Sequence, residues 1–388
     1  MKKISIFLPI LYLLSASISL GFVTAAKTAL VIENTTGDVL LSKQIYKPIP
    51  PASMSKLMTL WMTFEALDQG RISLQDELLV SKKAWKKGGS KMFLRQGEKV
   101  SIENLLRGVI IQSGNDACIV LAEGLAGTEE NFAELMNIRA REIGLLHSSF
   151  SNSTGWPHPN HKMSSNDIMI LANKIRTNFP QYYKIFKEID FTWDGITQKN
   201  RNPMLYMNIG ADGLKTGYTE EAGYGLIASA KQKSRRRSFI ITGLDSTRQR
   251  ARESKAITTW AFNNFKIINL FKKNEPIATV PIWLGVKDQL EIASSLDTSF
   301  LSLNNAETLI SAKLILDGDI VAPVKKGDPL NGRLVIKTKS LLSENGKKRE
   351  LSFPLIANET VDKGGVLVRI KTNFRLLKKQ ITDLFRIN

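Results

Sequence analysis

The sequence is poor in the side chains that hold metal ions or cross-link small domains. It contains one cysteine and three histidines in 388 residues. The single cysteine, Cys118, excludes an intramolecular disulfide, and its apolar surroundings at 117–122 predict a buried, unreactive thiol. His147, His158 and His161 have no cysteine partners and lack the His-Glu-x-x-His spacing of zinc peptidases. We therefore expect no metal and no cofactor.

Acidic residues are also few compared with basic ones. The 36 Asp and Glu stand against 54 Lys and Arg, which leaves a net charge of +18. Such an excess suits nucleic acid, anionic lipid or an acidic polymer and carries no information about the fold.

The N-terminus separates these classes of partner. Lys2 and Lys3 precede an apolar run that continues to about Leu20, and small residues follow at 23–26. This layout is typical of a secretory signal peptide, which we predict at residues 1–25. An uncleaved membrane anchor is the alternative, because the run is close to the minimum length of a span. Export makes a nucleic-acid partner unexpected.

Residues 26–272 are predicted to form one α/β (α+β) domain. A hairpin is expected at 28–41, helices between about 53 and 175, and a strand at 189–193. Strands at 213–217, 225–228 and 238–241 resemble an antiparallel meander, and a helix at 252–264 follows. The pattern predicts a helical cluster packed against an antiparallel sheet.

Two smaller parts are expected after this domain. Short strands separated by glycines predict an all-β domain of the sandwich type at 273–362. Residues 363–388 are predicted to form a basic amphipathic helix, with apolar side chains at spacings of three and four from Ile370 to Leu384. We expect this helix to bind an anionic membrane surface. The alternative is that its apolar stripe packs on the β-domain.

Three short motifs carry candidate chemistry. Ser53 and Lys56 lie three residues apart at an expected helix start, so the hydroxyl and the amine can meet. Ser113 and Asn115 fall in an expected loop between helices, and Lys215-Thr216-Gly217 lies on an expected strand. Each motif alone is weak, but their order and contexts together are typical of serine acyl-transferring enzymes.

The residue types fit acyl transfer. A serine hydroxyl barely ionises at neutral pH, so Ser53 needs a base, and Lys56 can act as one only when neutral. Burial near a second cation, Lys215, would lower the pKa of Lys56 in the required direction. Ser113 could pass a proton to the leaving amine, and Asn115 could orient Lys56 or hold a substrate amide. A Ser-His-Asp triad is the competing design, which the scarcity of histidine disfavours.

The remaining candidate residues would bind substrate. Lys215 offers a positive charge to a carboxylate, Thr216 a hydroxyl, and Gly217 space for an extended peptide. The backbone N–H groups of Ser53 and Tyr218 are candidates for the oxyanion hole.

With these motifs the sequence resembles the D-alanyl-D-alanine carboxypeptidases among the low-molecular-mass penicillin-binding proteins, of the penicillin-binding protein 5 and 6 type. The resemblance covers nearly the whole chain after residue 25 and includes 51–53, 92–94, 112–118, 200–202, 212–217 and 253–255. It implies a β-lactamase/transpeptidase-like fold, a peptidoglycan stem peptide as substrate and β-lactams as covalent inhibitors. It also implies a place on the periplasmic face of the inner membrane.

The resemblance also implies residue roles. Ser53 would be the nucleophile, Lys56 the proton acceptor, Ser113 an aid to proton transfer, and Lys215 a substrate ligand. Arg250 stands where the family has an arginine that meets the terminal carboxylate, and Arg201 lies near it. The position after Gly217 is often histidine in relatives but is Tyr218 here.

Other functions stay open at this point. A serine β-lactamase shares the motifs, but no acidic residue occurs between Glu142 and Asp167, where a class A enzyme would need its deacylating glutamate. A D,D-endopeptidase differs only in substrate. A non-enzymatic penicillin sensor or wall-binding module would be expected to carry a signalling domain or several membrane spans, and neither is recognisable.

Overall fold

A computed structural model of the chain describes residues 4–7, 21–304, 309–339 and 348–366, together with 368 and 370. By its internal contacts the chain divides into two compact units. One comprises residues 21–263, and the other comprises residues from 264 onward with the N-terminal strand. The division precedes the boundary expected at 272, because strand β11 (Phe265–Asn269) pairs with β14 (Ser299–Leu303) of the second unit.

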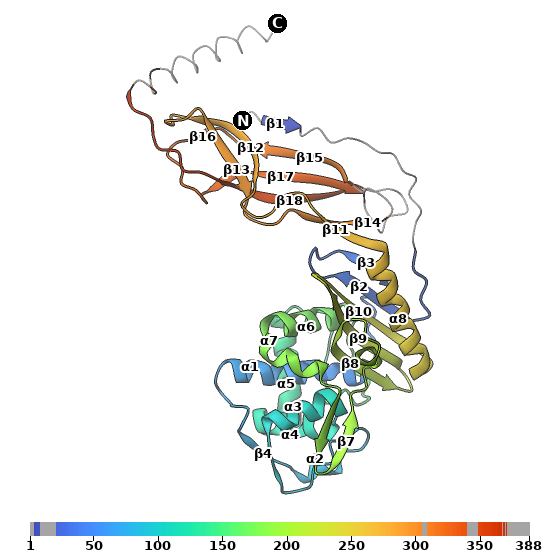
Figure 1. Cartoon of the computed structure of the whole chain (residues 1–388). Helices are drawn as coiled ribbons and strands as arrows, with labels where there is room; N and C mark the ends of the chain where they lie inside the picture. The colour runs from blue at the N-terminus through green and yellow to red at the C-terminus, as the bar shows by residue number, and fades with distance from the viewer. Residues whose placement is uncertain are drawn as a thin grey trace. The chain divides into compact units, whose positions relative to one another are not determined.

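The first unit contains a five-stranded antiparallel sheet with the order β3-β2-β10-β9-β8. Its strands are β2 (Thr28–Glu33), β3 (Val39–Lys43), β8 (Ala211–Thr219), β9 (Gly223–Gln232) and β10 (Arg235–Leu244). The expected hairpin and the meander are thus joined into one sheet, with β8 at its edge. Helix α6 (Ser165–Asn178) covers one face, and Figure 1 shows α8 (Thr247–Asn264) on the other.

The other helices of this unit form a cluster around α1. They are α1 (Lys56–Asp68), α2 (Lys82–Lys86), α3 (Ile102–Arg107), α4 (Asn115–Ala126), α5 (Glu129–Glu142) and α7 (Pro180–Tyr183). Short 3-10 turns occupy Ala52–Ser55, Lys184–Lys187 and Pro203–Tyr206, and two hairpins pair β4 (Glu77–Leu79) with β5 (Lys99–Ser101) and β6 (Asp190–Trp193) with β7 (Ile196–Lys199).

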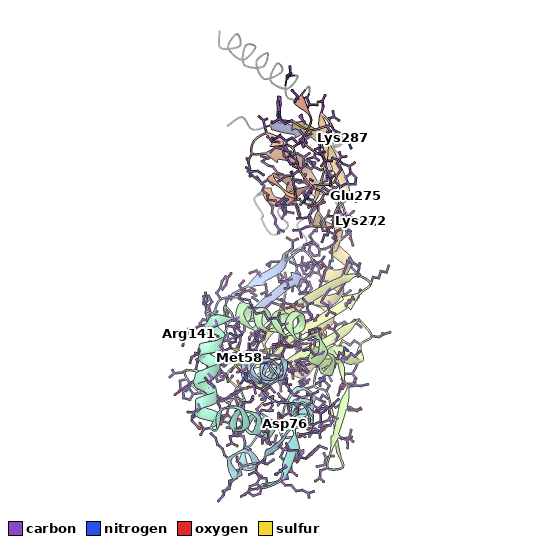
Figure 2. The ribbon with its side chains drawn as sticks, turned by 90° about the vertical axis from the view of Figure 1, so that its left-hand side faces the viewer. Met58, Asp76, Arg141, Lys272, Glu275 and Lys287 are labelled. Atoms are coloured by element: carbon purple, nitrogen blue, oxygen red, sulfur yellow. The ribbon has the colours of Figure 1, made fainter. Side chains whose placement is uncertain are left out.

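Helix α1 runs through the middle of the cluster because it is apolar on nearly every side. Met58 is fully buried, and Figure 2 shows it on α1 with the other helices around it. Helix α4 is equally buried from Ala117 to Ala122. Two rigid, buried helices that each begin at a motif give the candidate site a fixed base.

Local sequence explains where these helices begin. Ser164 accepts a hydrogen bond from the backbone N–H of Asp167 at the start of α6, as its position before an apolar period predicts. Helix α8 begins earlier than the expected residue 252, because Ser246 accepts the N–H of Gln249 in the same way. The extra turn carries Arg250.

The second unit has its own apolar core and a mainly antiparallel sheet with the order β1-β15-β17-β18-β13-β12-β16. Its strands are β1 (Ile4–Phe7), β12 (Pro276–Trp283), β13 (Gln289–Ser294), β15 (Leu309–Leu316), β16 (Ile320–Val321), β17 (Pro329–Lys339) and β18 (Lys348–Ala357). The expected all-β character is confirmed.

The structure describes only parts of the two terminal segments that were predicted from the sequence. Strand β1 falls inside the expected signal peptide and pairs with β15, whereas residues 8–20 lie outside the described residues. Most of the expected C-terminal helix, from 371 on, also lies outside them. Within the described ranges, no helix has the length and apolar character of a membrane span.

Candidate active site

The candidate nucleophile lies on a tight turn between the sheet and α1. Ser53 is half-buried in the 3-10 turn Ala52–Ser55, whose other residues are buried. Ala52 has φ of 50°, a left-handed conformation that costs a residue with a Cβ about 1–2 kcal/mol. Packing holds the turn in place: a Cβ on Gly217 of β8 would lie 3.0 Å from the Pro51 carbonyl oxygen. The absence of a side chain at Gly217 therefore lets β8 lie close to this turn.

Lys56 is placed as the sequence predicts. Its Nζ donates to the Ser53 Oγ at 2.9 Å and to the Thr154 carbonyl oxygen at 2.6 Å, and its side chain is completely buried. Burial lowers the pKa of Lys56 to about 8, and the nearby charge of Arg201 acts in the same direction. A neutral amine beside a serine hydroxyl is thus accessible close to neutral pH.

A second serine–lysine pair lies on the other two motifs. Lys215 on β8 donates to the Ser113 Oγ at 2.8 Å. Ser113 has φ of 60° and follows the π-helical turn Gly108–Gln112, which confirms the expected interruption between helices. Burial lowers the pKa of Lys215 well below its ordinary value, and Lys56 and Arg201 add to the effect.

Asn115 and Thr216 complete the motif residues. The Asn115 side chain donates from Nδ2 to the Gly88 carbonyl at 2.8 Å and borders the cleft. Thr216 is buried next to Lys215 on β8. The structure therefore brings the three sequence motifs to one place, although it does not place Asn115 in a hydrogen bond with Lys56.

Both candidate arginines come from other elements and act electrostatically on Lys215. Arg250 of α8 is buried, its Nε has no partner within the described residues, and burial lowers its pKa to about 10. Arg201 donates to the Ser90 Oγ, and burial lowers its pKa as well. Each lowers the pKa of Lys215, so the cations gather where an anion would be stabilised.

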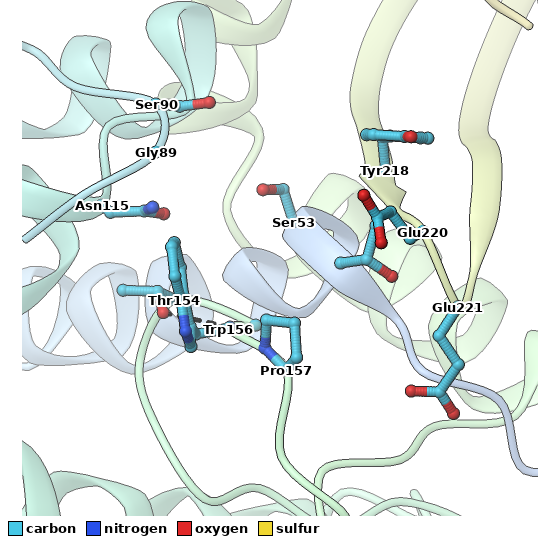
Figure 3. Close-up of a pocket in the computed structure, with 12 residues that line it drawn as sticks. Ser53, Gly89, Ser90, Asn115, Thr154, Trp156, Pro157, Tyr218, Glu220 and Glu221 are labelled. Atoms are coloured by element: carbon cyan, nitrogen blue, oxygen red, sulfur yellow. Dashed lines mark hydrogen bonds between the residues drawn. The ribbon is translucent and has the colours of Figure 1, made fainter.

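A cleft of about 680 Å³ opens beside Ser53. Figure 3 shows Ser53 between Asn115 and Trp156 on one side and Tyr218 on the other. Tyr218 is half-exposed, and its ring stacks on Tyr224 with centroids 4.1 Å apart. The rest of the lining is Gly89, Ser90, Thr154, Gly155, Pro157, Thr219, Glu220 and Glu221.

Sequence reasoning assigned no individual role to several residues that build this cleft. The Asp116 carboxylate accepts the backbone N–H groups of 92–94 and so fixes the segment above α4. Trp156 forms a wall and carries the Lys87 ammonium 4.2 Å from its ring centroid. Asp116 follows the Ser-x-Asn motif directly, which was a usable signal, whereas Trp156 had none.

The competing chemistries find no support in the geometry. His161 contacts Ser55 and not Ser53, which excludes it as the base of a Ser53 triad in this arrangement. Cys118 is buried, and burial raises its thiol pKa to about 12, as an inert thiol requires. In the part of the chain that the structure describes, no three His, Cys, Asp or Glu side chains are grouped so that they could hold a metal ion.

The α+β fold and the converging serine–lysine pairs define a serine enzyme of the penicillin-binding, transpeptidase-like class. The chain belongs to the D-alanyl-D-alanine carboxypeptidase family, whose model matches residues 17–246. The C-terminal domain of penicillin-binding protein 5 matches residues 265–363.

Individual relatives agree along most of the chain. D-alanyl-D-alanine carboxypeptidase DacD of Escherichia coli strain K12 is 34% identical, with 89% of each chain covered. DacF of Bacillus subtilis strain 168 is 33% identical over 89% of this chain and 88% of its own. Penicillin-binding protein 5 from Haemophilus influenzae superposes with a TM-score of 0.75 at 31% identity, covering 91% of this chain and all of the other.

A shorter solved relative matches only part of the chain. Penicillin-binding protein D2 from Listeria monocytogenes, solved in an ampicillin-bound form, has a TM-score of 0.57 at 26% identity. It covers 62% of this chain and 99% of its own. The expected family and fold are confirmed, and the chain is an enzyme of the carboxypeptidase kind.

Proposed function

We propose that the protein removes the terminal D-alanine from peptidoglycan pentapeptide stems through an acyl-enzyme on Ser53. Neutral Lys56 accepts the Ser53 proton, and the Oγ attacks the carbonyl carbon of the penultimate D-alanine. The contact that carries this proposal is the 2.9 Å hydrogen bond between the buried Lys56 and Ser53. Family membership and the relatives' names support the substrate.

Other residues would stabilise the oxyanion and assist the leaving group. The backbone N–H groups of Ser53 and Tyr218 would donate hydrogen bonds to the developing oxyanion. The C–N bond breaks as the Ser113 hydroxyl, hydrogen-bonded to Lys215, passes a proton to the amine of departing D-alanine. Ser113 would be reprotonated with the proton that Lys56 took from Ser53, which leaves Lys56 neutral again. In the second half Lys56 accepts a proton from water as the water oxygen attacks the ester carbonyl, and that proton returns to the Ser53 Oγ as the ester bond breaks.

Binding would begin with the substrate's carboxylate. Arg250 and Arg201 supply a positive field, and an arriving carboxylate would favour the protonated form of Lys215, whose pKa burial and the neighbouring cations lower. Thr216 lies beside Lys215 on the edge strand. Asn115 and Gly217 border the path of the preceding peptide. A β-lactam, which carries a comparable carboxylate, would acylate Ser53 in the same way, and the ampicillin-bound relative supports this part of the proposal.

The test is release of D-alanine from a pentapeptide ending in D-Ala-D-Ala, with Ser53→Ala as the control. Release that the substitution abolishes supports the proposal. If no D-alanine appears while a labelled penicillin still acylates Ser53, the protein is a penicillin sensor or an endopeptidase that needs cross-linked stems. Rapid turnover of the penicillin without peptide hydrolysis would instead identify a β-lactamase.

We further propose the order of parts along the exported protein: a signal peptide at 1–25, the peptidase, the β-domain that begins at 264, and a membrane-surface helix at 363–388. The basic and apolar periodicity of the last segment supports peripheral attachment to the periplasmic face of the inner membrane.

Deleting residues 366–388 tests this attachment, and we expect the mature protein to move from the membrane to the soluble fraction. Phe374→Ser with Leu377→Ser is the matched variant, because it removes apolar area and keeps every charge. Membrane binding that survives both changes contradicts the anchor.

A further inference from the structure

His161 is a buried titratable residue with no role in the proposed reaction. It is 2% exposed, and both ring nitrogens are engaged. The backbone N–H of Ser151 donates to Nδ1 at 3.2 Å, so Nδ1 must be the unprotonated nitrogen. Nε2 therefore carries the hydrogen and donates to the Ser55 Oγ at 2.7 Å. The structure thus fixes one neutral tautomer.

The two partners of His161 belong to different parts of the site. Ser55 is the last residue of the 3-10 turn that carries Ser53. Ser151 begins the segment 151–161, which we call the Thr154 loop. His161 is the last residue of this loop. Its ring joins the two ends of the loop through Ser151 and ties the loop to Ser55 of the nucleophile turn, 106 residues earlier in the sequence.

The Thr154 loop supplies the polar environment of the base. The Thr154 carbonyl accepts from the Lys56 Nζ at 2.6 Å, and the Ser153 carbonyl accepts from Thr59 one turn further along α1 at 2.6 Å. Lys56 is completely buried with this carbonyl on its amine, and burial is the main cause of its lowered pKa. A change in loop position would alter both the carbonyl contact and the hydration of Lys56.

We propose that His161 is a positioning residue for Lys56. Its Nε2–H holds the Thr154 loop against the nucleophile turn through Ser55, and the loop in turn holds Lys56 beside Ser53 in a dry pocket. The groups that act on the ring electrostatically are Lys56, His158 and Lys162, all cationic when protonated, so they favour the neutral ring. The inference rests on the proposed acyl transfer.

Two substitutions of nearly equal size separate the two ring contacts. His161→Asn can place its side-chain carbonyl near Nδ1 and keep the bond from Ser151, but it loses the donor to Ser55. His161→Gln reaches further and can keep the donor to Ser55. Ser55→Ala removes the same bond from the other side with the loss of one oxygen atom, and His147→Gln is a control at an exposed histidine.

The measurement is the rate of Ser53 acylation by a fluorescent penicillin as a function of pH. For His161→Asn and Ser55→Ala we expect the pH at which the rate levels off to rise by about one unit, because water that reaches Lys56 returns its pKa toward the ordinary value. The rate near neutral pH then falls about tenfold and recovers at high pH. His161→Gln and His147→Gln should keep the wild-type profile.

A purely structural brace predicts something else. Lower thermal stability with an unshifted pH profile in His161→Asn and Ser55→Ala would overturn the proposal. Effects of His161→Asn and Ser55→Ala that add fully in the double variant would also overturn the proposal, because both substitutions remove the same hydrogen bond. If the wild-type protein is not acylated at all, the proposed function fails, which is a separate outcome.

Discussion

At the residue scale the proposed chemistry depends on the charge of Lys56. A lysine with an ordinary pKa near 10.5 would be almost fully protonated at neutral pH and could not accept the Ser53 proton. With its pKa lowered to about 8, roughly one molecule in ten has a neutral Lys56 near pH 7. Burial is the main cause of the lowered pKa of Lys56, and burying the charged form of this side chain lowers the stability of the folded protein.

The pH dependence of acylation follows with a definite sign. Because the neutral amine is the active form, the rate of Ser53 acylation should rise about tenfold per pH unit below about pH 8 and level off above it. Stopped-flow acylation by a penicillin between about pH 5.5 and 9.5 measures this profile. A rate that is constant across the range would show that Lys56 is not the group that accepts the proton.

The sequence located the residues whose roles depend on motif spacing and left out those that depend on tertiary contact. Ser53 and Lys56 meet because they are three residues apart. The partner of Lys56 on its other side, Thr154, is 98 residues away, and no periodicity indicates that contact. The sequence indicated no contact for His161, and only the fold reveals Ser55 beside it.

At the element scale the nucleophile turn and the Thr154 loop are interlocked. Gly155 has φ of 76°, and a Cβ there would lie 2.0 Å from the Ala52 carbonyl oxygen. The loop can approach the turn this closely only because the residue is glycine. Two short irregular segments therefore define the active-site geometry together, although neither has a regular pattern in the sequence.

A pair of glycine substitutions separates backbone strain from this close approach. Gly155→Ala and Gly127→Ala both place alanine at positive φ, at 76° and 77°, but nothing lies within 4 Å of a Cβ at Gly127. We expect Gly127→Ala to lower the free energy of unfolding by about 1–2 kcal/mol and leave acylation unchanged. Gly155→Ala should in addition slow acylation at least tenfold.

Thermal unfolding and penicillin labelling measure these two effects. Equal behaviour of the two variants would mean that the loop moves aside without disturbing Ser53.

Strands were predicted well where an extended segment is bounded by turn residues. The strands β2, β8, β9 and β10 were expected within a few residues, although β8, β9 and β10 contain long buried runs without alternation. The strands β13 and β14 were missed, because segments of only six and five residues are too short to show a period.

At the scale of the whole molecule, each unit has a separate apolar core. All the candidate site residues lie between 53 and 250, within the first unit. The Listeria relative covers 62% of this chain, and 99% of its own length is matched.

We expect a fragment of residues 21–263 to fold and to keep the full protein's kcat/KM for a soluble peptide ending in D-Ala-D-Ala, within about twofold. Circular dichroism and the D-alanine assay measure this. A folded fragment with strongly reduced kcat/KM would show that the β-domain contributes to catalysis.

The gathering of cations around Lys215 has a consequence for how the two kinds of acyl-enzyme end. Once Ser53 has attacked, a carboxylate that stays in the site offsets the local positive field and raises the pKa of Lys56, so less of the neutral amine is available for the next proton transfer. Departing D-alanine takes that carboxylate with it, the field returns, and the base is reset for the attacking water. An opened penicillin keeps its carboxylate covalently attached after acylation. We therefore expect the penicillin ester to persist, because the retained carboxylate keeps the pKa of Lys56 raised and leaves less neutral amine to activate water. The same electrostatics would then favour release of the substrate acyl group and retention of the antibiotic.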